Sequence, residues 1–341
     1  MNPVDLNSHL SVLDGWLQCP QCSSEKIKRL EDFYYCEGCL AEFPIKRGIP
    51  DFRLFADPYI SIRDEDEKSE RIVGDGSCDF EQLIDRYYHL TPEVAPGLQE
   101  RYKRGLRSGV ARGQHLLESC AAPIQGPVLE VGCGTGGLMI AAGQRYDTPI
   151  VGVDIALRWL TIARQRLVES GQPALLICAN AEHLPFKADV FGEILSESTL
   201  EHTVDPFIAL KEMARVAKPD APFFIQTANR TTFVEPYTGF PFPFLIPKLY
   251  RNQVIGRVCK TPYLLTPLTG REILEHFPTQ TAGVIVAPYL PFSEHFGESS
   301  FLKRSFFKAY RYALTIQLGR SILACFGMFI IVSGRFKKAR V

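Results

Sequence analysis

The 341-residue sequence has no excess of charge of either sign, no long apolar run and no basic, apolar leader. Lys plus Arg and Asp plus Glu both number 38, so the chain as a whole has no positive field that would hold a polyphosphate backbone. Asp5, Asp14 and Gln18 interrupt the first twenty residues, which is unlike the apolar core of a secretion signal. The sequence therefore predicts a cytoplasmic protein with reduced cysteines.

A membrane-spanning segment is not predicted, and no internal repeat is present. Residues 321–334 carry no charge, but this stretch is too short, because a helix needs about 20 apolar residues to cross a bilayer. Its side chains, among them Phe329, Ile330 and Val332, favour a buried strand instead. Hydrophobic residues make up 46% of the chain, enough for one large core and a small appended module.

Four of the ten cysteines form two closely spaced pairs near the amino terminus. The pairs are Cys19-Pro-Gln-Cys22 and Cys36-Glu-Gly-Cys39, with thirteen residues between them. This spacing lets four thiolates, those of Cys19, Cys22, Cys36 and Cys39, converge on one tetrahedral zinc ion. So short a segment cannot bury a large apolar core, so we expect zinc to supply much of its folding free energy.

The cysteine segment resembles the zinc-binding activator subunit of tRNA and release-factor methyltransferases. The resemblance includes the Pro-Ile and Gly-Ile-Pro sequences that follow Cys39. It is also similar to the amino-terminal zinc module of a ribosomal RNA guanine methyltransferase. We expect a zinc-ribbon-like module over residues 1–57. The dense charge run within 63–70 predicts a linker over 58–78, and apolar spacing predicts helices over 79–120.

From residue 127 onward, apolar runs alternate with helical periodicity. Strands are predicted at 128–131, 150–153, 174–178, 191–196, 222–227, 284–287 and 326–332, with helices from about 138, over 156–170 and over 207–216. This alternation predicts an α/β fold with a Rossmann-like, seven-stranded, mostly parallel sheet flanked by helices over 121–341. Residues 229–268, rich in proline and aromatics, are expected to form an insertion, either an apolar lid over the site or a packing arm.

A glycine-rich turn follows the first predicted strand of this region. Gly132, Gly134 and Gly137 also satisfy the G-x-G-x-x-G pattern of dinucleotide enzymes, so a nicotinamide cofactor is a competing interpretation. Glu130, just before the turn, favours a ligand with an ammonium and a sulfonium over a pyrophosphate. Asp154 ends the next strand, where it can accept ribose hydroxyls.

With these residues and the loop Ala179-Asn-Ala-Glu-His-Leu-Pro-Phe186, residues 127–228 resemble the class I S-adenosylmethionine-dependent methyltransferases. The resemblance implies adenosylmethionine as cofactor. It places Glu130, Gly132, Gly134 and Gly136 at the methionine moiety, Asp154 at the ribose, and Asn180 with Ala181 at the adenine. Asn180 departs from the family's usual Asp. The expected cofactor-binding set is completed by Cys133, Ile155 and Ser196.

His202 follows the fourth strand of the predicted sheet and is the candidate catalytic base; the alternative is that it caps or packs against the next helix. We expect substitutions of His202, Tyr237 and Arg230 to be the most informative about the acceptor site. The leading functional hypothesis is methyl transfer to a small-molecule or lipid-like acceptor. RNA is the alternative, supported by the basic residues Arg101, Lys103, Arg104, Arg107 and Arg112, and an inactive binding protein is the third.

Overall fold

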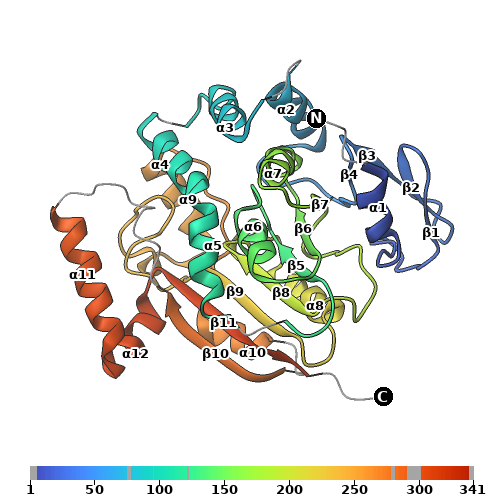
Figure 1. The fold of residues 1–341 in the computed structure, drawn as a ribbon. Coiled ribbons are helices and arrows are strands. Elements are labelled where there is room, and N and C mark those ends of the chain that lie inside the picture. Colours follow the sequence, from blue (N-terminus) through green and yellow to red (C-terminus); the bar gives the residue numbers. More distant parts are fainter. Residues whose placement is uncertain are drawn as a thin grey trace.

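The protein is built on a seven-stranded sheet with a smaller four-stranded sheet at its amino-terminal side (Figure 1). The large sheet has the order β10-β11-β9-β8-β5-β6-β7, in which β10 and β11 are antiparallel to their neighbours and the other five strands run parallel. The computed structural model describes residues 6–74, 78–94, 96–120, 123–277, 281–289 and 301–337.

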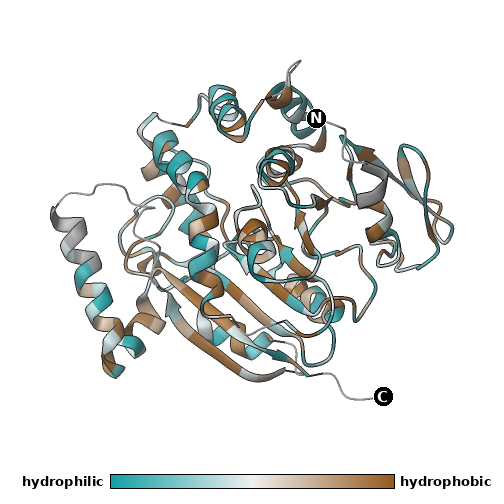
Figure 2. Ribbon diagram, viewed as in Figure 1, coloured by the Kyte–Doolittle hydropathy of each residue, from teal (hydrophilic) through white to brown (hydrophobic). Residues whose placement is uncertain are grey.

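The predicted α/β sheet is confirmed in type, strand number and order along the chain. Every residue of three strands is buried, which is the pattern of a parallel sheet covered on both faces by helices (Figure 2). The strands are β5 (Val128–Val131), β6 (Ile150–Asp154), β7 (Leu175–Cys178), β8 (Glu193–Glu197), β9 (Pro222–Ala228), β10 (Thr281–Tyr289) and β11 (Phe329–Phe336), and the intervening helices are α6 (Gly137–Arg145), α7 (Leu157–Glu169) and α8 (Pro206–Val216).

The cysteine module packs on the β7 edge of the large sheet and shares its core. The Phe52 amide donates to the Cys178 carbonyl at 2.7 Å, and the Gln18 amide donates to the Pro185 carbonyl at 3.1 Å. Phe52 lies in one continuous apolar cluster with side chains of the sheet. The module consists of α1 (Leu6–Asp14), β1 (Ile27–Arg29), β2 (Phe33–Cys36), β3 (Glu42–Lys46) and β4 (Ile49–Pro50).

The charge run that predicted a linker forms a packed helix, so that prediction is wrong. Helix α2 (Ile62–Val73) buries Glu65, Ser69 and Ile72, which recur at helical spacing on one face, and its Asp66 pairs with Lys46 and Arg53. Glu65 accepts a hydrogen bond from the Arg158 backbone amide on α7 at 2.8 Å and also pairs with the Arg158 guanidinium. Residues 75–77 of the expected linker lie outside the described part of the chain.

Three further helices follow α2 along the chain before the first strand of the large sheet, in agreement with the helices predicted over 79–120. Helix α3 packs against α7, and α5 packs against α6. Arg166 of α7 donates to the Arg107 carbonyl and stacks over Phe80, which ties this layer together. The helices are α3 (Phe80–His89), α4 (Pro96–Arg107) and α5 (Gly109–Leu117).

The insertion after β9 and the connection between β10 and β11 both form helices. Residues 321–334 are divided between a helix and a strand, and among the described residues no helix is long and apolar enough to cross a bilayer. The elements are the 3₁₀ turn η2 (Pro243–Leu245), α9 (Lys248–Cys259) and α10 (Gly270–His276), then α11 (Phe301–Thr315) and α12 (Gln317–Phe326).

Because Phe52 is fully buried between the module and the sheet, Phe52→Ala is expected to destabilise the whole chain by about 3–5 kcal/mol. Denaturant unfolding should remain one transition with a lower midpoint. Leu40→Ala is the control, since Leu40 is an exposed leucine of the same module and should change stability by less than about 0.5 kcal/mol. A separate early transition in Phe52→Ala, with the main transition unmoved, would show that the module folds independently.

Candidate active site

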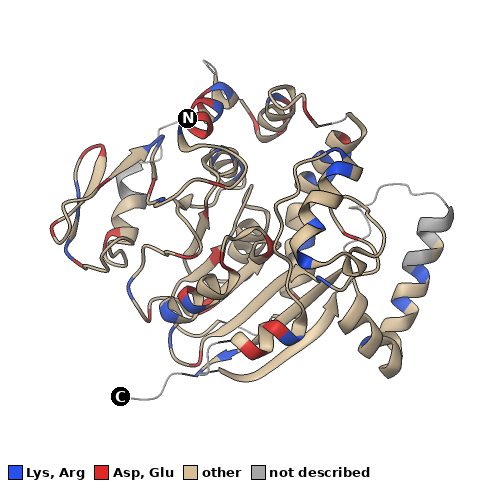
Figure 3. Ribbon diagram, turned by 180° about the vertical axis from the view of Figure 1, so that it is seen from behind, with Lys and Arg blue, Asp and Glu red and all other residues tan. Residues whose placement is uncertain are grey.

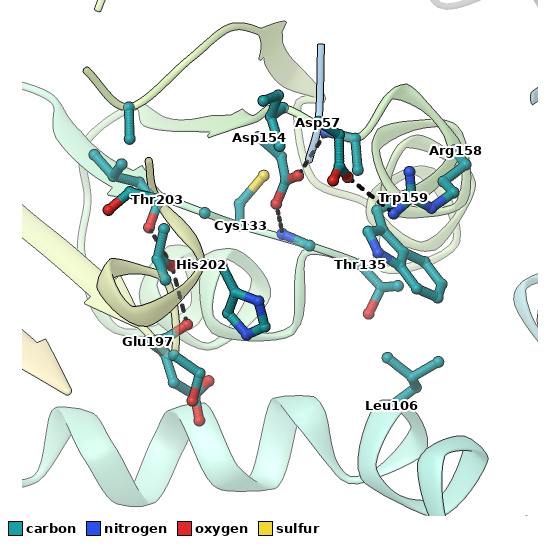
Figure 4. Close-up of a pocket in the computed structure, with 18 of the residues that line it drawn as sticks. Asp57, Leu106, Cys133, Thr135, Asp154, Arg158, Trp159, Glu197, His202 and Thr203 are labelled. Atoms are coloured by element: carbon teal, nitrogen blue, oxygen red, sulfur yellow. Dashed lines mark hydrogen bonds and ion pairs between the residues drawn. The ribbon is translucent and has the colours of Figure 1, made fainter. Parts of the chain in front are cut away.

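A cavity of about 590 Å³ lies at the carboxyl ends of β5, β6 and β8. Open parallel sheets bind ligands at this edge, because the loops that follow neighbouring strands meet there. The walls come from the glycine turn after β5, the end of β6, the loop after β8, helices α4 and α5, and residues 55–59 of the tail that follows the cysteine module (Figure 4).

The glycine turn requires glycine for two separate reasons. Gly132 has φ +79°, and a β-carbon there would overlap the Thr199 side chain, which donates to the Val131 carbonyl at 3.1 Å. A β-carbon on Gly137 would lie 2.7 Å from the Gly109 backbone, so this glycine lets α5 and α6 cross closely. Gly134, with φ +49°, has no atom within 4 Å of its β-carbon position and leaves the cavity floor open.

Glu130, on β5, is a buried carboxylate in the cavity wall. Its Oε2 atom has no hydrogen-bond partner in the described structure. Burial raises the pKa of Glu130 well above its usual value, and the charges of Glu197 and Asp154 raise it further while Arg112 lowers it. A buried carboxylate with an unsatisfied oxygen is stabilised by a cation, so this end of the cavity favours a positively charged ligand group.

Asp154 closes the adjacent side at the end of β6. Its Oδ2 accepts from the Gly134 amide and its Oδ1 from the Ala156 amide, both at 2.8 Å. Burial nevertheless raises the pKa of Asp154 to about 6, since the two amide donors only partly offset desolvation. Each carboxylate oxygen keeps a further lone pair that can accept from a ligand hydroxyl.

His202 and Glu197 lie in another part of the cavity wall (Figure 4), and Tyr237 also lines the cavity. His202 belongs to the 3₁₀ turn η1 (Leu200–His202), and burial lowers its pKa, so its imidazole is neutral at neutral pH. The Tyr237 hydroxyl donates to Glu201 at 2.6 Å, and the ring lies edge-on to His202 with centroids 5.4 Å apart. Glu197 pairs with Arg112 of α5.

Residues 55–59 form a wall of the cavity that sequence reasoning missed. Phe55, Asp57 and Tyr59 line it, and Asp57 pairs with Arg158 at 3.1 Å. No spacing in the sequence connects Asp57 with Arg158, because the two lie about a hundred residues apart and meet only when α2 packs on α7. The tail therefore joins the cysteine module to the cavity.

Most of the predicted cofactor residues lie together, but three do not reach the cavity. Asn180 is fully buried, and its amide holds the tail instead: its Oδ1 accepts from the Leu54 amide at 2.8 Å and its Nδ2 donates to the Phe55 carbonyl at 3.1 Å. Gly136 faces α7, and Ser196 donates to the Val131 carbonyl. The predicted residues that do line the cavity are Glu130, Gly132, Cys133, Gly134, Asp154, Ile155, Ala181 and His202.

Of the other two residues singled out for mutation, Tyr237 lines the cavity and Arg230 does not. Arg230 pairs with Glu272 on α10. Of the insertion that was expected to form a lid, the residues that line the cavity are Pro236 and Tyr237.

The four cysteines of the module converge as their spacing predicts. Their sulfur atoms all lie within 4.8 Å of one another, and the Cys19–Cys39 and Cys22–Cys36 pairs are each 3.6 Å apart. Tetrahedral zinc with bonds of about 2.3 Å separates its sulfur ligands by about 3.8 Å, so the observed arrangement fits such an ion.

The sheet order, the glycine turn and the acidic strand ends agree with the methyltransferase resemblance of the sequence. Residues 129–225 match the family described as "Methyltransferase domain". This match agrees with the sequence resemblance and covers the glycine turn, the end of β6 and most of the parallel strands.

The chain is similar to curated proteins named ubiquinone biosynthesis O-methyltransferase. The identity is 28% over 152 residues for the Aliivibrio fischeri protein, covering 44% of this chain and 61% of that protein. It is 33% over 157 residues for the Paracidovorax citrulli protein, covering 44% and 60%. The Yersinia enterocolitica protein is 27% identical over 213 residues, covering 58% and 84%. The chain thus spans about three fifths of the length of the first two relatives.

Solved structures of similar fold include a possible histamine N-methyltransferase from Thermotoga maritima, with a TM-score of 0.45 and 17% identity, covering 76% of this chain and 98% of that one. A complex of the Haloferax volcanii Trm112 methyltransferase activator with a putative methyltransferase has a TM-score of 0.45 and 16% identity, covering 72% and 93%.

The raised pKa of Asp154 predicts a pH-dependent stability that needs no ligand. The folded chain keeps this proton up to about pH 6, whereas an unfolded aspartate loses it near pH 4, so unfolding releases a proton between these values. The Asp154 contribution to stability is therefore greatest below about pH 4 and falls as pH rises through about 6. Urea unfolding at several pH values should show wild type losing about 2–3 kcal/mol relative to Asp154→Asn over this range. Parallel profiles for the two proteins would contradict the burial of this acid.

Proposed function

We propose that the chain binds S-adenosylmethionine in this cavity and transfers its methyl group to a small-molecule or lipid-like acceptor. The observation that carries the proposal is the buried Glu130 carboxylate beside the glycine turn, whose Oε2 atom has no hydrogen-bond partner in the described structure. The amino group and the sulfonium of adenosylmethionine are cations that suit this acid. A dinucleotide would instead place its pyrophosphate among Glu130, Asp154 and Glu197, where like charges repel it.

The other walls suit the rest of the cofactor. Asp154 lies on the next strand end, where its free lone pairs can accept from the ribose hydroxyls. Phe55, Ala181 and Trp159 offer apolar surface for the adenine. Asn180 is not part of this proposal, since its amide is already bonded to the tail.

The chemistry required of the protein is chiefly alignment. Methyl transfer is an in-line displacement at the sulfonium, so holding the acceptor and the methyl group in near-attack geometry and excluding water supplies most of the acceleration. An acceptor hydroxyl must lose a proton as the bond forms, and the neutral His202 in the cavity wall can take it. The names of the relatives, which are O-methyltransferases, support a hydroxyl acceptor.

Aromatic side chains favour a flat or apolar acceptor over a highly charged one. Tyr59, Tyr102 and Phe329 line the cavity along with Leu106. The basic residues that supported RNA are mostly neutralised within the protein: Lys103 pairs with Asp85, Arg107 with Glu81, and Arg112 with Glu197. The best sequence argument for RNA is thereby weakened.

Glu130→Gln is expected to weaken adenosylmethionine binding by roughly 10- to 100-fold, because it removes the charge that pairs with the ligand cation and keeps the shape of the side chain. The matched control is Glu193→Gln. Glu193 is also buried, also has a carboxylate oxygen without a hydrogen-bond partner in the described structure and has a pKa raised by burial to about 8, but it lies outside the cavity. Isothermal titration calorimetry distinguishes the two; equal affinities for Glu130→Gln and wild type would refute the cofactor position.

The acceptor class is tested by incubating the protein with radiolabelled adenosylmethionine and a fractionated cell extract. Label in the lipid or small-metabolite fraction, lost in His202→Ala although cofactor binding is retained, supports the proposal. Label in the RNA or protein fraction would assign a different acceptor.

We also propose that the four cysteines hold zinc and that the metal supports cofactor binding through the tail. The Phe52 amide, the Asn180 bonds and the Asp57–Arg158 pair fix the tail between the module and the cavity. Zinc bound by the four thiolates would hold the two cysteine pairs together and keep this tail ordered.

Cys22→Ser is therefore expected to lose bound zinc, measured by elemental analysis, and to weaken adenosylmethionine binding by about tenfold or more, because fewer molecules have the tail in place. Cys78→Ser, at a cysteine outside the cluster, should retain both. If Cys22→Ser lost zinc but bound adenosylmethionine with unchanged affinity, the metal would not support cofactor binding.

A further inference from the structure

Two long segments of this neutral chain contain no acidic residue. Residues 236–271 carry five Lys and Arg, and residues 299–341 carry nine, without a single Asp or Glu in either. The remaining residues must carry a matching excess of acid, since the whole chain has a formal net charge of zero. The sequence therefore has a net excess of positive charge in the insertion after β9 and in the carboxyl-terminal segment, although within the first segment Arg251 is buried and Arg271 pairs with Glu275.

The same two segments expose large apolar side chains. In the first, Leu245, Leu249 and Val258 are 71%, 77% and 64% exposed; in the second, Tyr312, Leu318 and Ile322 are 70%, 73% and 46% exposed. Isolated exposed leucines are ordinary, but a concentration of them on neighbouring elements usually marks an interaction site.

The two segments meet in space. The Phe244 ring of η2 lies 5.9 Å from the Phe326 ring at the end of α12, and the ring of Phe233, just before the first segment, stacks on Phe326 at 5.0 Å. Helices α9, α11 and α12 all lie on the side of the molecule away from the cysteine module (Figure 1). We name the exposed residues of α9, α11, α12 and η2 the basic apolar face.

Cations are interleaved with the apolar side chains on this face. Lys308 and Arg311 are exposed on α11 beside Tyr312, and Arg320 is exposed on α12 between Leu318 and Ile322. Seen from behind, the described part of α11 carries Lys and Arg and no acidic residue (Figure 3).

The face is also connected to the cavity. Pro236 and Tyr237 line the cavity and begin the first acid-free segment, and Phe329, three residues after α12, lines it within the second. An apolar acceptor that reached this face would therefore be adjacent to the elements that border the site.

We propose that the basic apolar face binds the surface of a bilayer that contains anionic phospholipids. Apolar side chains flanked by Lys and Arg insert at the level of the headgroups while the cations meet lipid phosphates, which requires no membrane-spanning helix. RNA would satisfy the cations but would leave Leu245, Leu249 and Leu318 without apolar partners. The proposal does not depend on methyl transfer, because its test measures vesicle binding alone.

The test is co-sedimentation of the full chain with phosphatidylcholine vesicles that contain or lack phosphatidylglycerol. We expect binding to the anionic vesicles, weakening as salt is raised, and little binding to pure phosphatidylcholine. Lys308→Gln with Arg311→Gln should weaken binding about fivefold for each charge removed. Leu318→Glu should abolish it, whereas Leu274→Glu, at an exposed leucine of α10 outside both segments, should not change it.

Circular dichroism and the thermal midpoint check that each variant is folded. Three results would overturn the proposal: no binding of wild type to anionic vesicles, undiminished binding by Leu318→Glu, or retention of a structured RNA in preference to the vesicles.

Discussion

The site depends on one electrostatic constraint, a carboxylate held at a strand end where water cannot solvate it. Glu130 is buried in the cavity wall with one oxygen unpartnered, and its neighbours Asp154 and Glu197 are also acids. Such an arrangement is costly in the free protein and is relieved by a bound cation. The glycine turn, which no side chain larger than hydrogen can occupy at Gly132, brings the ligand close enough for that relief.

The amino-terminal segments also help to form the cavity. The cysteine module shares a core with the sheet, its tail forms a cavity wall, and α2 contributes Glu65 to the pairs that hold Arg158 against Asp57. In the proposed function, cofactor binding depends on residues 51–73 as well, which lie outside the segment that matches the methyltransferase family. A truncated domain would lack both this wall and the partners of Arg158.

Much of the fold could be predicted from the sequence because it depends on local signals. Strands such as 128–131, the glycine turn and the cysteine spacing follow directly from residue type and period. Contacts between distant segments could not be predicted. Asn180 has the residue type and position expected of an adenine contact, yet it bonds to Leu54 and Phe55, and α2 was mistaken for a linker because its three buried residues are hidden among charges.

A crystal structure of the chain with S-adenosylhomocysteine tests the central claim most directly. We expect the ligand's amino group within hydrogen-bond distance of Glu130, its ribose hydroxyls at Asp154 and its adenine against the wall formed by residues 55–59. A ligand bound elsewhere, or a nucleoside in this cavity with its amino group turned away from Glu130, would contradict the account.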